Sequence, residues 1–305
     1  MQNEETKPQL CGFLNVLKPP GMSSARAVAL VRRALGGVKT GHAGTLDPEA
    51  AGVLPLMIGK AARLFDDLQF DQKAYIAEIA FGAETDTQDA QGRVVRRSDL
   101  MPTEMELRAL FPLLVGEMEQ TPPMYSALKQ GGKRLYALAR EGKTVQRKSR
   151  AMTLFSLELL RMMPGNGALI SLRCSKGFYV RTLCHDIGGM IGCPAHMRFL
   201  LRTASGIFTL DTAKTLEEIE SAAARGDLQS LLLPVEDVLA HLPCAEVPEH
   251  LLKPFQNGVP LPLSAFPALN GAEQGGRVQL RVGGRTTAIA RIQDELLKPA
   301  TWLQE

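Results

Sequence analysis

Asp47, an aspartate on a constrained loop, is the residue of this sequence whose neighbours best suit a catalytic role. Asp47 lies in the stretch TGHAGTLDPEAAGVLPLMIGKA at residues 40–61, directly before Pro48. The proline biases Asp47 toward an extended backbone, and Gly41 and Gly44 allow the main chain to approach a ligand closely. A surface turn would explain these residues but not the apolar run AAGVLPLMIG behind them, which is typical of a buried segment. A loop braced by a core segment is a suitable place to hold one reactive carboxylate.

A second candidate feature is a cluster of positive charge at residues 129–150. This segment holds eight lysines and arginines against one glutamate, a net charge of +7, whereas the whole chain carries +3. Such a run is either a solvated helix face with a loop or an arm that contacts a polyanion, because lysine and arginine neutralise phosphates. Tyr125 and Tyr136 add aromatic surface within or beside the run, which favours RNA. We therefore expect a basic RNA-binding arm over about residues 124–150.

Composition excludes several other classes of protein. The 305 residues are 45% hydrophobic and 22% charged, which is typical of a soluble globular protein with one large domain or two unequal ones. No apolar run reaches the roughly 18 residues that span a bilayer, and the N-terminal MQNEETKPQL is unlike a signal peptide. The five cysteines form no Cys-x-x-Cys pair, and their odd number argues against a disulfide framework. These features predict a cytoplasmic protein.

Common cofactor and nucleophile motifs are absent from the sequence. It contains no GxxxxGK[ST], no GxSxG and no GxGxxG. Cys184, His185, Cys193 and His196 lie close together, but their spacing matches no usual zinc site. The segment TDTQDAQG at 85–92 lacks the glutamate that closes a calcium loop, so a hairpin turn is the better interpretation. We expect neither a metal ion nor an organic cofactor.

Periodicity and end signals predict the elements that would position these residues. A helix is expected over SSARAVALVRRALGG, capped by Ser23 or Ser24, and another over LEEIESAAARGD. A third should follow Thr103, which has capping-box spacing to Glu106. KAYIAEIAFGAET at 73–85 predicts one strand, and ALISLRCSKGFYVRTLCHDIGGMIG predicts a strand, a glycine turn and a helix.

The amino-acid composition of the chain changes after about residue 240. A stretch rich in proline and glycine is followed by RVQLRVGGRTTAIARIQ, which alternates across Gly283-Gly284 and indicates a β-hairpin. We expect a small β-rich module at about 245–305. A module of this size needs help from its neighbour, or unusually good packing, to be stable.

Six ordered blocks of the sequence resemble the TruB family of tRNA pseudouridine synthases, in its bacterial branch. The match runs from about residue 12 to about residue 210, and the last 60 residues resemble a PUA-like RNA-binding module more loosely. The blocks are LNVLKPPGMSS (14–24), GHAGTLDPEAAGVLPLMIGKA (41–61), KAYIAEIAFGAETDTQDAQG (73–92), QTPPMYSALKQGGKRLYALAREG (120–142), CSKGFYVRTLCHDIG (174–188) and AHMRFLLRTASGIF (195–208).

The resemblance implies a fold and a domain organisation. The fold class is α+β, with a mixed, mostly antiparallel central sheet flanked by helices, as in pseudouridine synthases. Residues 1–244 would form the catalytic domain, including the basic arm, and residues 245–305 a small β-rich PUA-like RNA-binding domain.

The resemblance also implies an activity, namely isomerisation of the uridine at position 55 in the T loop of tRNA to pseudouridine, on a flipped-out base. The catalytic aspartate of the family corresponds to Asp47, and the residue that meets the neighbouring nucleotides to His42. The other family residues correspond to Tyr75, which stacks on the target base, to Lys18, which supports the catalytic loop, and to Tyr179, Arg181 and Leu200 in the pocket. The partner would be the T arm of tRNA, bound by a monomer without an obligatory protein partner. The chain departs from the family at His185, where an acidic residue is common.

The residue chemistry agrees with this reading. One carboxylate can start the reaction by covalent attack on the sugar or the uracil, or by removing a sugar proton to leave a bound glycal. Ordinary glycoside hydrolysis needs two carboxylates at one bond, and the only acid adjoining Asp47 in sequence is Glu49. Arg181 would keep Asp47 ionised, Tyr75 would stack the flipped base, and Leu200 would exclude water. Both routes stay open, as do two alternatives: a non-catalytic tRNA-binding or RNA-chaperone protein, and a synthase for another RNA.

Overall fold

The computed structural model describes residues 10–68, 72–125, 129–130, 133–140, 142 and 145–303. Within them nine strands form the larger sheet, in the order β1-β3-β12-β4-β11-β10-β7, with β2 paired to β3 and β13 to β12. Its pairings are antiparallel except that of β3 with β12, which confirms the predicted fold class. The strands are β1 (Gly12–Lys18), β2 (Thr40–His42), β3 (Ala51–Ile58), β4 (Gln72–Phe81), β7 (Gly116–Gln120), β10 (Arg150–Met163), β11 (Gly167–Ser175), β12 (Ala195–Ser205) and β13 (Phe208–Thr209).

The parallel pairing is a seam between the two halves of this sheet. Leu201 and Arg202 of β12 lie opposite Ala51 and Gly52 of β3. Gly52 has φ 110°, and a Cβ there would lie 2.2 Å from the Arg202 carbonyl oxygen, so this close approach requires glycine. The loop at residues 43–50 runs directly into β3. The fold therefore brings the predicted catalytic loop to the middle of the sheet, against β12.

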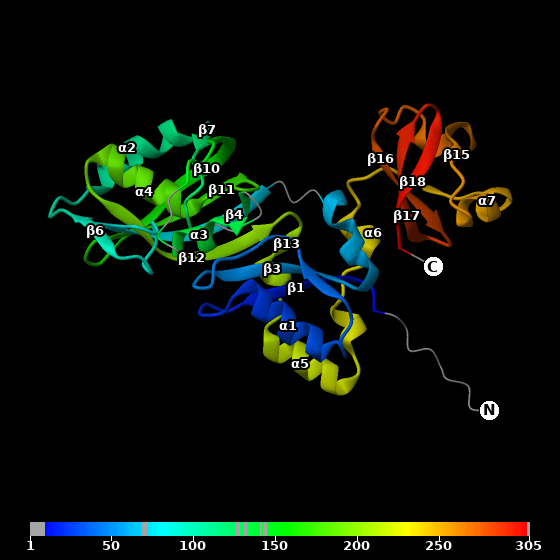
Figure 1. The fold of residues 1–305 in the computed structure, drawn as a ribbon, viewed down its shortest axis with the longest axis horizontal. Coiled ribbons are helices and arrows are strands. Elements are labelled where there is room, and N and C mark those ends of the chain that lie inside the picture. Colours follow the sequence, from blue (N-terminus) through cyan, green and yellow to red (C-terminus); the bar gives the residue numbers. More distant parts are fainter. Residues whose placement is uncertain are drawn as a thin grey trace.

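Four of the described helices, α1, α2, α4 and α5, lie where the sequence predicts them. The helix α1 begins after Ser23, whose hydroxyl accepts the Arg26 N–H, and it packs against α5 beside β1 (Figure 1). Capping boxes at Thr103 and Thr215 begin α2 and α5. The helices are α1 (Ser24–Ala34), α2 (Glu104–Leu114), α3 (Leu135–Arg140), α4 (Val180–Ile191), α5 (Leu216–Arg225), α6 (Val235–Val238) and α7 (Leu252–Gln256), and the 3₁₀ helix η1 (Gly59–Asp67) follows β3. No helix in the described part of the chain is long and apolar enough to cross a bilayer.

One predicted element is wrong in its extent. Residues 73–85 do not form a single strand, because the backbone turns at Gly82, where φ is 87°. The strand β4 ends at Phe81, and the short strand β5 (Ala83–Thr85) then pairs with β6 (Val94–Arg97). The intervening segment TDTQDAQG is the predicted hairpin turn.

The C-terminal part of the chain forms a second sheet. Its order is β14-β16-β17-β18-β15, and the predicted Gly283-Gly284 turn joins β16 to β17. A separate apolar core lies within it, around Phe255 and Phe266. The strands are β14 (Cys244–Glu246), β15 (Leu261–Pro262), β16 (Arg277–Val282), β17 (Arg285–Gln293) and β18 (Leu296–Trp302).

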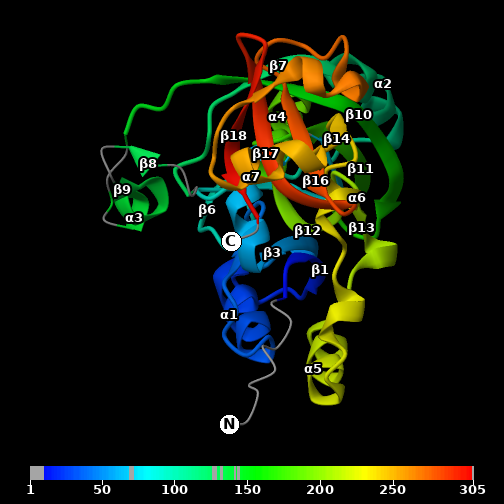
Figure 2. The same ribbon diagram turned by 90° about the vertical axis from the view of Figure 1, so that its right-hand side faces the viewer.

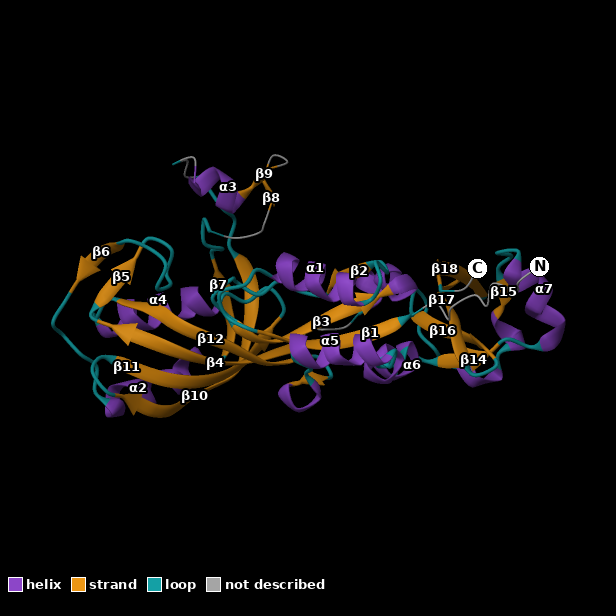
Figure 3. Ribbon diagram, turned by 90° about the horizontal axis from the view of Figure 1, so that it is seen from below, coloured by secondary structure: helices purple, strands orange, loops and turns teal. Residues whose placement is uncertain are grey.

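The second sheet is anchored to the first at one end of an elongated molecule (Figures 1 and 3). Ile289 and Leu303 join an apolar cluster with Phe13 and Val53 of the first sheet. Polar contacts reinforce this junction: the Arg277 guanidinium lies 3.1 Å from the buried Asp67 carboxylate, and the Thr286 N–H donates to Glu236 at 2.5 Å. The first sheet, η1 and α6 thus all contact the second sheet.

The predicted basic arm includes the hairpin β8 (Lys129–Gln130) and β9 (Lys133–Arg134) and the helix α3, which stand out from the body of the molecule (Figures 2 and 3). The side chains of most of its basic residues, and of Tyr136, lie outside the described residues. The role of this arm is therefore still a prediction from the sequence.

Candidate active site

The loop that carries Asp47 is held by side chains from the N-terminal segment. The buried Ser24 hydroxyl donates to the Leu46 carbonyl and accepts the Leu46 N–H, both at 2.9 Å. The Met22 N–H donates to the Pro48 carbonyl at 3.2 Å. Leu46 itself is buried in the main core. The backbone on each side of Asp47 is fixed, while the carboxylate projects from it.

Lys18 at the end of β1 holds the same loop through hydrogen bonds. Its fully buried ammonium donates to the carbonyls of Pro48 at 3.0 Å, Met22 at 2.6 Å and Pro19 at 2.8 Å. Burial lowers the pKa of Lys18 to about 8, although the charges of Glu49 and Asp47 oppose this shift. The three carbonyls use all three donors of the protonated amine, so the charged form is the one that ties the loop to β1.

Arg181 connects Asp47 to a second carboxylate. The guanidinium lies 2.9 Å from Asp47 Oδ2 and 3.2 Å from Asp89 Oδ2, and the arginine side chain is only 7% exposed. Asp89 Oδ1 also accepts the Thr87 hydroxyl at 2.7 Å and the Gln91 N–H at 3.0 Å. Asp89 is therefore held in place by its own hairpin and orients Arg181, which in turn orients Asp47.

The Asp47 carboxyl is surrounded by charged groups and is still accessible to solvent. Burial raises the pKa of Asp47 and Asp89 adds to this, whereas Arg181 and Lys18 oppose it. Nevertheless 39% of the Asp47 side chain is accessible. A carboxylate with a raised pKa is a stronger base and nucleophile than an ordinary aspartate, and its ion pair fixes its direction.

Two adjacent strands, β4 and β12, present one face toward the loop. Tyr75 of β4 lies opposite Arg202 of β12, and Ala77 lies opposite Leu200. Tyr75 and Leu200 are each 7% exposed. Burial raises the pKa of Tyr75 to about 12, against the charge and hydrogen bond of Arg202, so the phenol is neutral at pH 7. The face, the floor of the site, combines the side chains of Tyr75 and Leu200 with the buried Arg202 guanidinium, and it adjoins the ion pair of Asp47 with Arg181.

Tyr179 and His42 lie at the edges of this site. Tyr179 is the residue before α4, two positions from Arg181, and its backbone exchanges two hydrogen bonds with the Gln120 side chain, at 2.9 and 3.2 Å. His42 ends β2, five residues before Asp47, and is half-buried. The structure therefore brings Asp47, Arg181 and Lys18 into one contact network, places Tyr75 and Leu200 on the adjoining floor, and leaves Tyr179 and His42 at its margin.

Comparison with known proteins identifies the family. Residues 32–180 match the model of the TruB family pseudouridylate synthase N-terminal domain, and residues 181–240 match the tRNA pseudouridylate synthase B C-terminal domain. The tRNA pseudouridine synthase B of Moorella thermoacetica is 45% identical over 298 residues, which cover 94% of this chain and 97% of that protein. That of Geobacillus thermodenitrificans is 47% identical over 262 residues, covering 84% and 87%. The chain belongs to the TruB family of pseudouridylate synthases.

Solved structures show the same fold in this TruB-family enzyme. The chain aligns with one from a Cbf5-Nop10-Gar1 complex with a TM-score of 0.71 and 24% identity, covering 96% of this chain and 84% of that one. It also aligns with one from an H/ACA RNP bound to a substrate RNA containing 2'-deoxyuridine, with a TM-score of 0.71 and 21% identity, over 100% and 93%. Both the large sheet and the C-terminal sheet therefore belong to a known architecture.

Sequence reasoning missed three residues of this TruB-family site. Asp89 lies in a hairpin turn 92 positions from Arg181, and the sequence indicates Ser24 only as a candidate helix cap. Arg202 is fully buried, and its guanidinium donates to the carbonyls of Val53 at 2.7 Å and of Thr45 and Gly44 at 3.4 Å. The only sequence signal for these three residues is that they lie within the six blocks that resemble the TruB family.

The cysteine and histidine cluster provides no metal site in the described part of the chain, where no group of three or more suitable ligands converges. Cys193 Sγ donates to the Leu100 carbonyl at 2.7 Å, and His196 Nδ1 lies 2.8 Å from the Ala83 carbonyl. Cys184 is completely buried, and burial raises its pKa. These side chains serve packing between α4, β12 and the β5–β6 hairpin.

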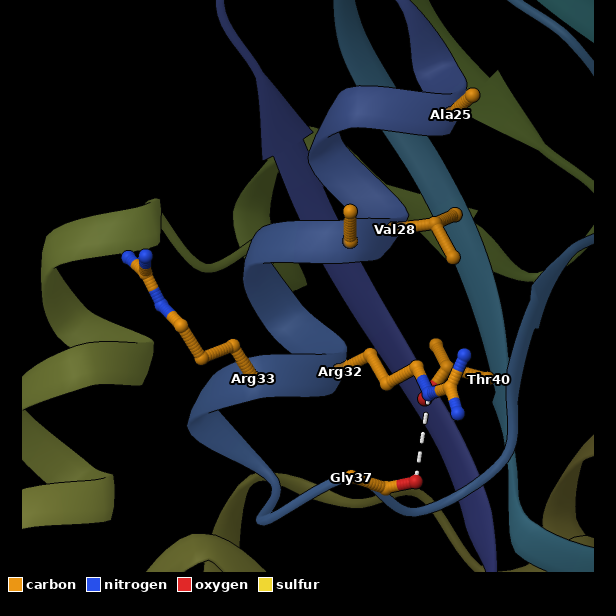
Figure 4. Close-up of a pocket in the computed structure, with 7 residues that line it drawn as sticks. Ala25, Val28, Arg32, Arg33, Gly37 and Thr40 are labelled. Carbon is orange, nitrogen blue, oxygen red and sulfur yellow. Dashed lines mark hydrogen bonds between the residues drawn. The ribbon is translucent and has the colours of Figure 1, made fainter.

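A separate hollow lies on the outer side of α1 (Figure 4). It is lined by Ala25, Val28, Arg32, Gly37 and Thr40, among others. Arg32 Nε donates to the Gly37 carbonyl at 3.3 Å, while Arg33 points toward α5. The hollow offers no carboxylate, thiol or imidazole and so no catalytic chemistry.

Replacement of Ser24 should separate positioning from packing. Ser24→Ala removes both hydrogen bonds to Leu46, leaves two buried backbone groups unpaired, and should lower stability by about 1–3 kcal/mol. The catalytic loop should shift enough to slow single-turnover conversion roughly 10- to 100-fold. The control is the adjacent Ser23→Ala, which removes only the cap of α1 and should lower stability by about 1 kcal/mol at an unchanged rate. Equal rates for the two variants would contradict a positioning role of Ser24.

Proposed function

We propose that this TruB-family enzyme isomerises the uridine at position 55 in the T loop of tRNA to pseudouridine, with Asp47 as its catalytic residue. The observation that carries the proposal is the accessible Asp47 carboxylate, held 2.9 Å from the buried Arg181 guanidinium beside the aromatic floor of Tyr75. The relatives named tRNA pseudouridine synthase B over most of the chain support tRNA as the substrate.

The reaction needs little beyond this set of groups. The C1′–N1 bond of the uridine breaks, a C1′–C5 bond forms, C5 loses a proton and N1 gains one. Asp47 starts the reaction, either by forming a covalent bond or by taking a sugar proton. Asp89 accepts from the Thr87 hydroxyl, the Gln91 N–H and Arg181, so its role is to hold Arg181 in place. Tyr75 and Leu200 hold the detached uracil and exclude water, so that the sugar is recaptured at C5 instead of hydrolysed.

Two further parts of the chain would grip the tRNA outside the pocket. We assign the catalytic domain to residues 1–244 and an RNA-binding domain to residues 245–305; the first strand of the second sheet, β14, begins one residue before this boundary, at Cys244. The ion pair of Asp67 with Arg277 and the shared apolar cluster fix this domain relative to the active site. The basic arm at residues 124–150 would contact phosphates of the T arm. Because phosphate contacts carry no direct sequence information, the arm would recognise the folded shape of the RNA more than its sequence.

Mapping of pseudouridine tests the proposed function directly. Purified enzyme is incubated with unmodified tRNA transcript in the presence of a chelator, and the RNA is then mapped at each uridine. We expect conversion of the T-loop uridine alone, without added metal, cofactor or protein. A protein that binds the transcript without converting any uridine would be an RNA-binding protein or chaperone, and conversion only in another RNA would identify a different substrate.

Tyr75 should act mainly through its ring. Tyr75→Leu removes a stacking surface for the flipped base, and such contacts contribute about 1–3 kcal/mol per base. Single-turnover conversion should therefore fall by more than tenfold, while T-arm affinity, dominated by phosphate contacts, changes less. Tyr75→Phe keeps the ring and is the matched control. If the leucine variant were as active as the phenylalanine variant, stacking on Tyr75 would be excluded.

A further inference from the structure

Lys73 is a cation of the active-site floor that the reaction described above does not use. It lies on β4 two residues before Tyr75, and the two side chains are on the same face of the strand. It is opposite Cys174 of β11 and Ser205 of β12. Two residues of strand span about 6.5 Å, so the ammonium lies within the reach of one nucleotide whose base stacks on Tyr75.

The Lys73 ammonium faces the catalytic loop at Gly44. A Cβ on Gly44 would lie 3.4 Å from Lys73 Nζ and 3.8 Å from an Arg202 guanidinium nitrogen. Gly44 has φ 138°, a conformation that favours glycine. Because no side chain stands at this position, a ligand that reaches Asp47 can also approach Lys73 across the Gly44 backbone.

The ammonium has no counter-ion among the described residues: neither a hydrogen bond nor an ion pair joins it to any of them. Its charged neighbours Arg202 and Lys176 are themselves cations, and burial together with these charges lowers the pKa of Lys73 to about 8. The Arg202 guanidinium donates to backbone carbonyls and not to a carboxylate. The floor beside Tyr75 therefore carries uncompensated positive charge, which is unfavourable unless an anion arrives.

We infer that Lys73 binds a backbone phosphate adjoining the target uridine. This inference rests on the proposed function, because the anion is taken to be part of an RNA whose base occupies the Tyr75 floor. Lys73 differs from the basic arm in its position: it is on the rigid sheet, beside the reacting nucleotide. The contact would tie the backbone of the flipped nucleotide down while Asp47 acts on its sugar.

Binding of a T-arm hairpin RNA tests Lys73 independently of turnover. Lys73→Met should weaken the affinity about tenfold, as expected for the loss of a charge-assisted hydrogen bond. It should also reduce the slope of log Kd against log salt by about 0.7–0.9, the value for one phosphate. Thermal stability should stay the same or rise, since a half-buried charge without a described counter-ion is removed. Lys73→Arg should retain most of the affinity.

Neutral phosphates locate the contact. Each phosphate that flanks the target uridine is replaced in turn by a neutral methylphosphonate. One of these RNAs should bind to the wild-type enzyme several-fold more weakly than the unmodified RNA does. The Lys73→Met variant should bind that RNA and the unmodified RNA equally well. The control Arg225→Met removes an exposed cation at the end of α5, on the side away from the basic arm (Figure 3), and should respond like wild type.

The outcomes separate the inference from the proposed function. Equal methylphosphonate effects in wild type and Lys73→Met would overturn the phosphate contact, as would a fall in turnover at unchanged affinity, which would assign Lys73 to the departing uracil. If wild type bound the T-arm hairpin no better than an unrelated hairpin, the proposed substrate itself would be wrong.

Discussion

Asp47→Asn should bind T-arm RNA with near-normal affinity and convert it at least ~10⁴-fold more slowly than wild type. The substitution keeps the size of the side chain and most of its hydrogen bonds but removes its charge, basicity and nucleophilicity. Phosphate contacts made elsewhere dominate the affinity, whereas loss of an essential nucleophile or base lowers turnover by several orders of magnitude. Single-turnover rates with saturating enzyme, read as pseudouridine in the T loop, measure the effect without interference from binding.

The control for Asp47 is a carboxylate that the site does not use. Asp211 is exposed and lies in the short 3₁₀ helix after β13, so Asp211→Asn removes the same charge without touching the catalytic loop and should convert tRNA at the wild-type rate. A protein that only binds or chaperones RNA would respond equally to both substitutions. Conversion by Asp47→Asn as fast as by wild type would remove Asp47 from the mechanism.

Local signals in the sequence predicted most of the elements around this site. The apolar run after Asp47 is β3, with all eight residues buried, and the capping box at Thr103 begins α2. These predictions succeed because the interactions that decide them lie within one turn or one strand. The strand predicted at 73–85 failed at Gly82, since periodicity does not reveal that a glycine inside an apolar pattern adopts a positive φ.

The contacts that make the site reactive join residues far apart in the chain. Ser24 meets Leu46 across 22 positions, and Arg202 meets Val53 across 149. A serine at a helix start has an adequate local explanation as a cap, and Ser23 does fill that role, so nothing local indicates that Ser24 holds the catalytic loop. Asp47 stands apart from Asp89 in the sequence, but the two carboxylates share Arg181 in the structure, because the hairpin that carries Asp89 folds back onto this arginine. The family resemblance could supply Asp47 and Arg181, but the contact with Asp89 required the fold.

Arg181→Met should produce the second-largest loss of activity, and its pH dependence should reveal the cause. The arginine is the one described cation within ion-pair distance of Asp47, and its removal leaves Asp47 and Asp89 as like-charged neighbours in a crowded site. The pKa of Asp47, already raised by burial and by Asp89, should rise further, because the largest opposing charge is gone. Loss of this charge and of the orientation it provides should slow single-turnover conversion roughly 10²- to 10³-fold at pH 7.

The sign of the pH effect follows from the need for an ionised Asp47. In wild type the rate should fall as the solution is acidified through the pKa of this carboxyl. In Arg181→Met the same acid limb should lie at higher pH, so that the variant recovers part of its deficit when the pH is raised from 6 toward 9. The matched control is Arg198→Met, which breaks an ion pair with Glu78 at 2.6 Å on the same sheet without touching Asp47, and it should keep the wild-type limb. An acid limb that stays in place in Arg181→Met, despite a slower rate, would mean that Arg181 positions Asp47 without controlling its charge.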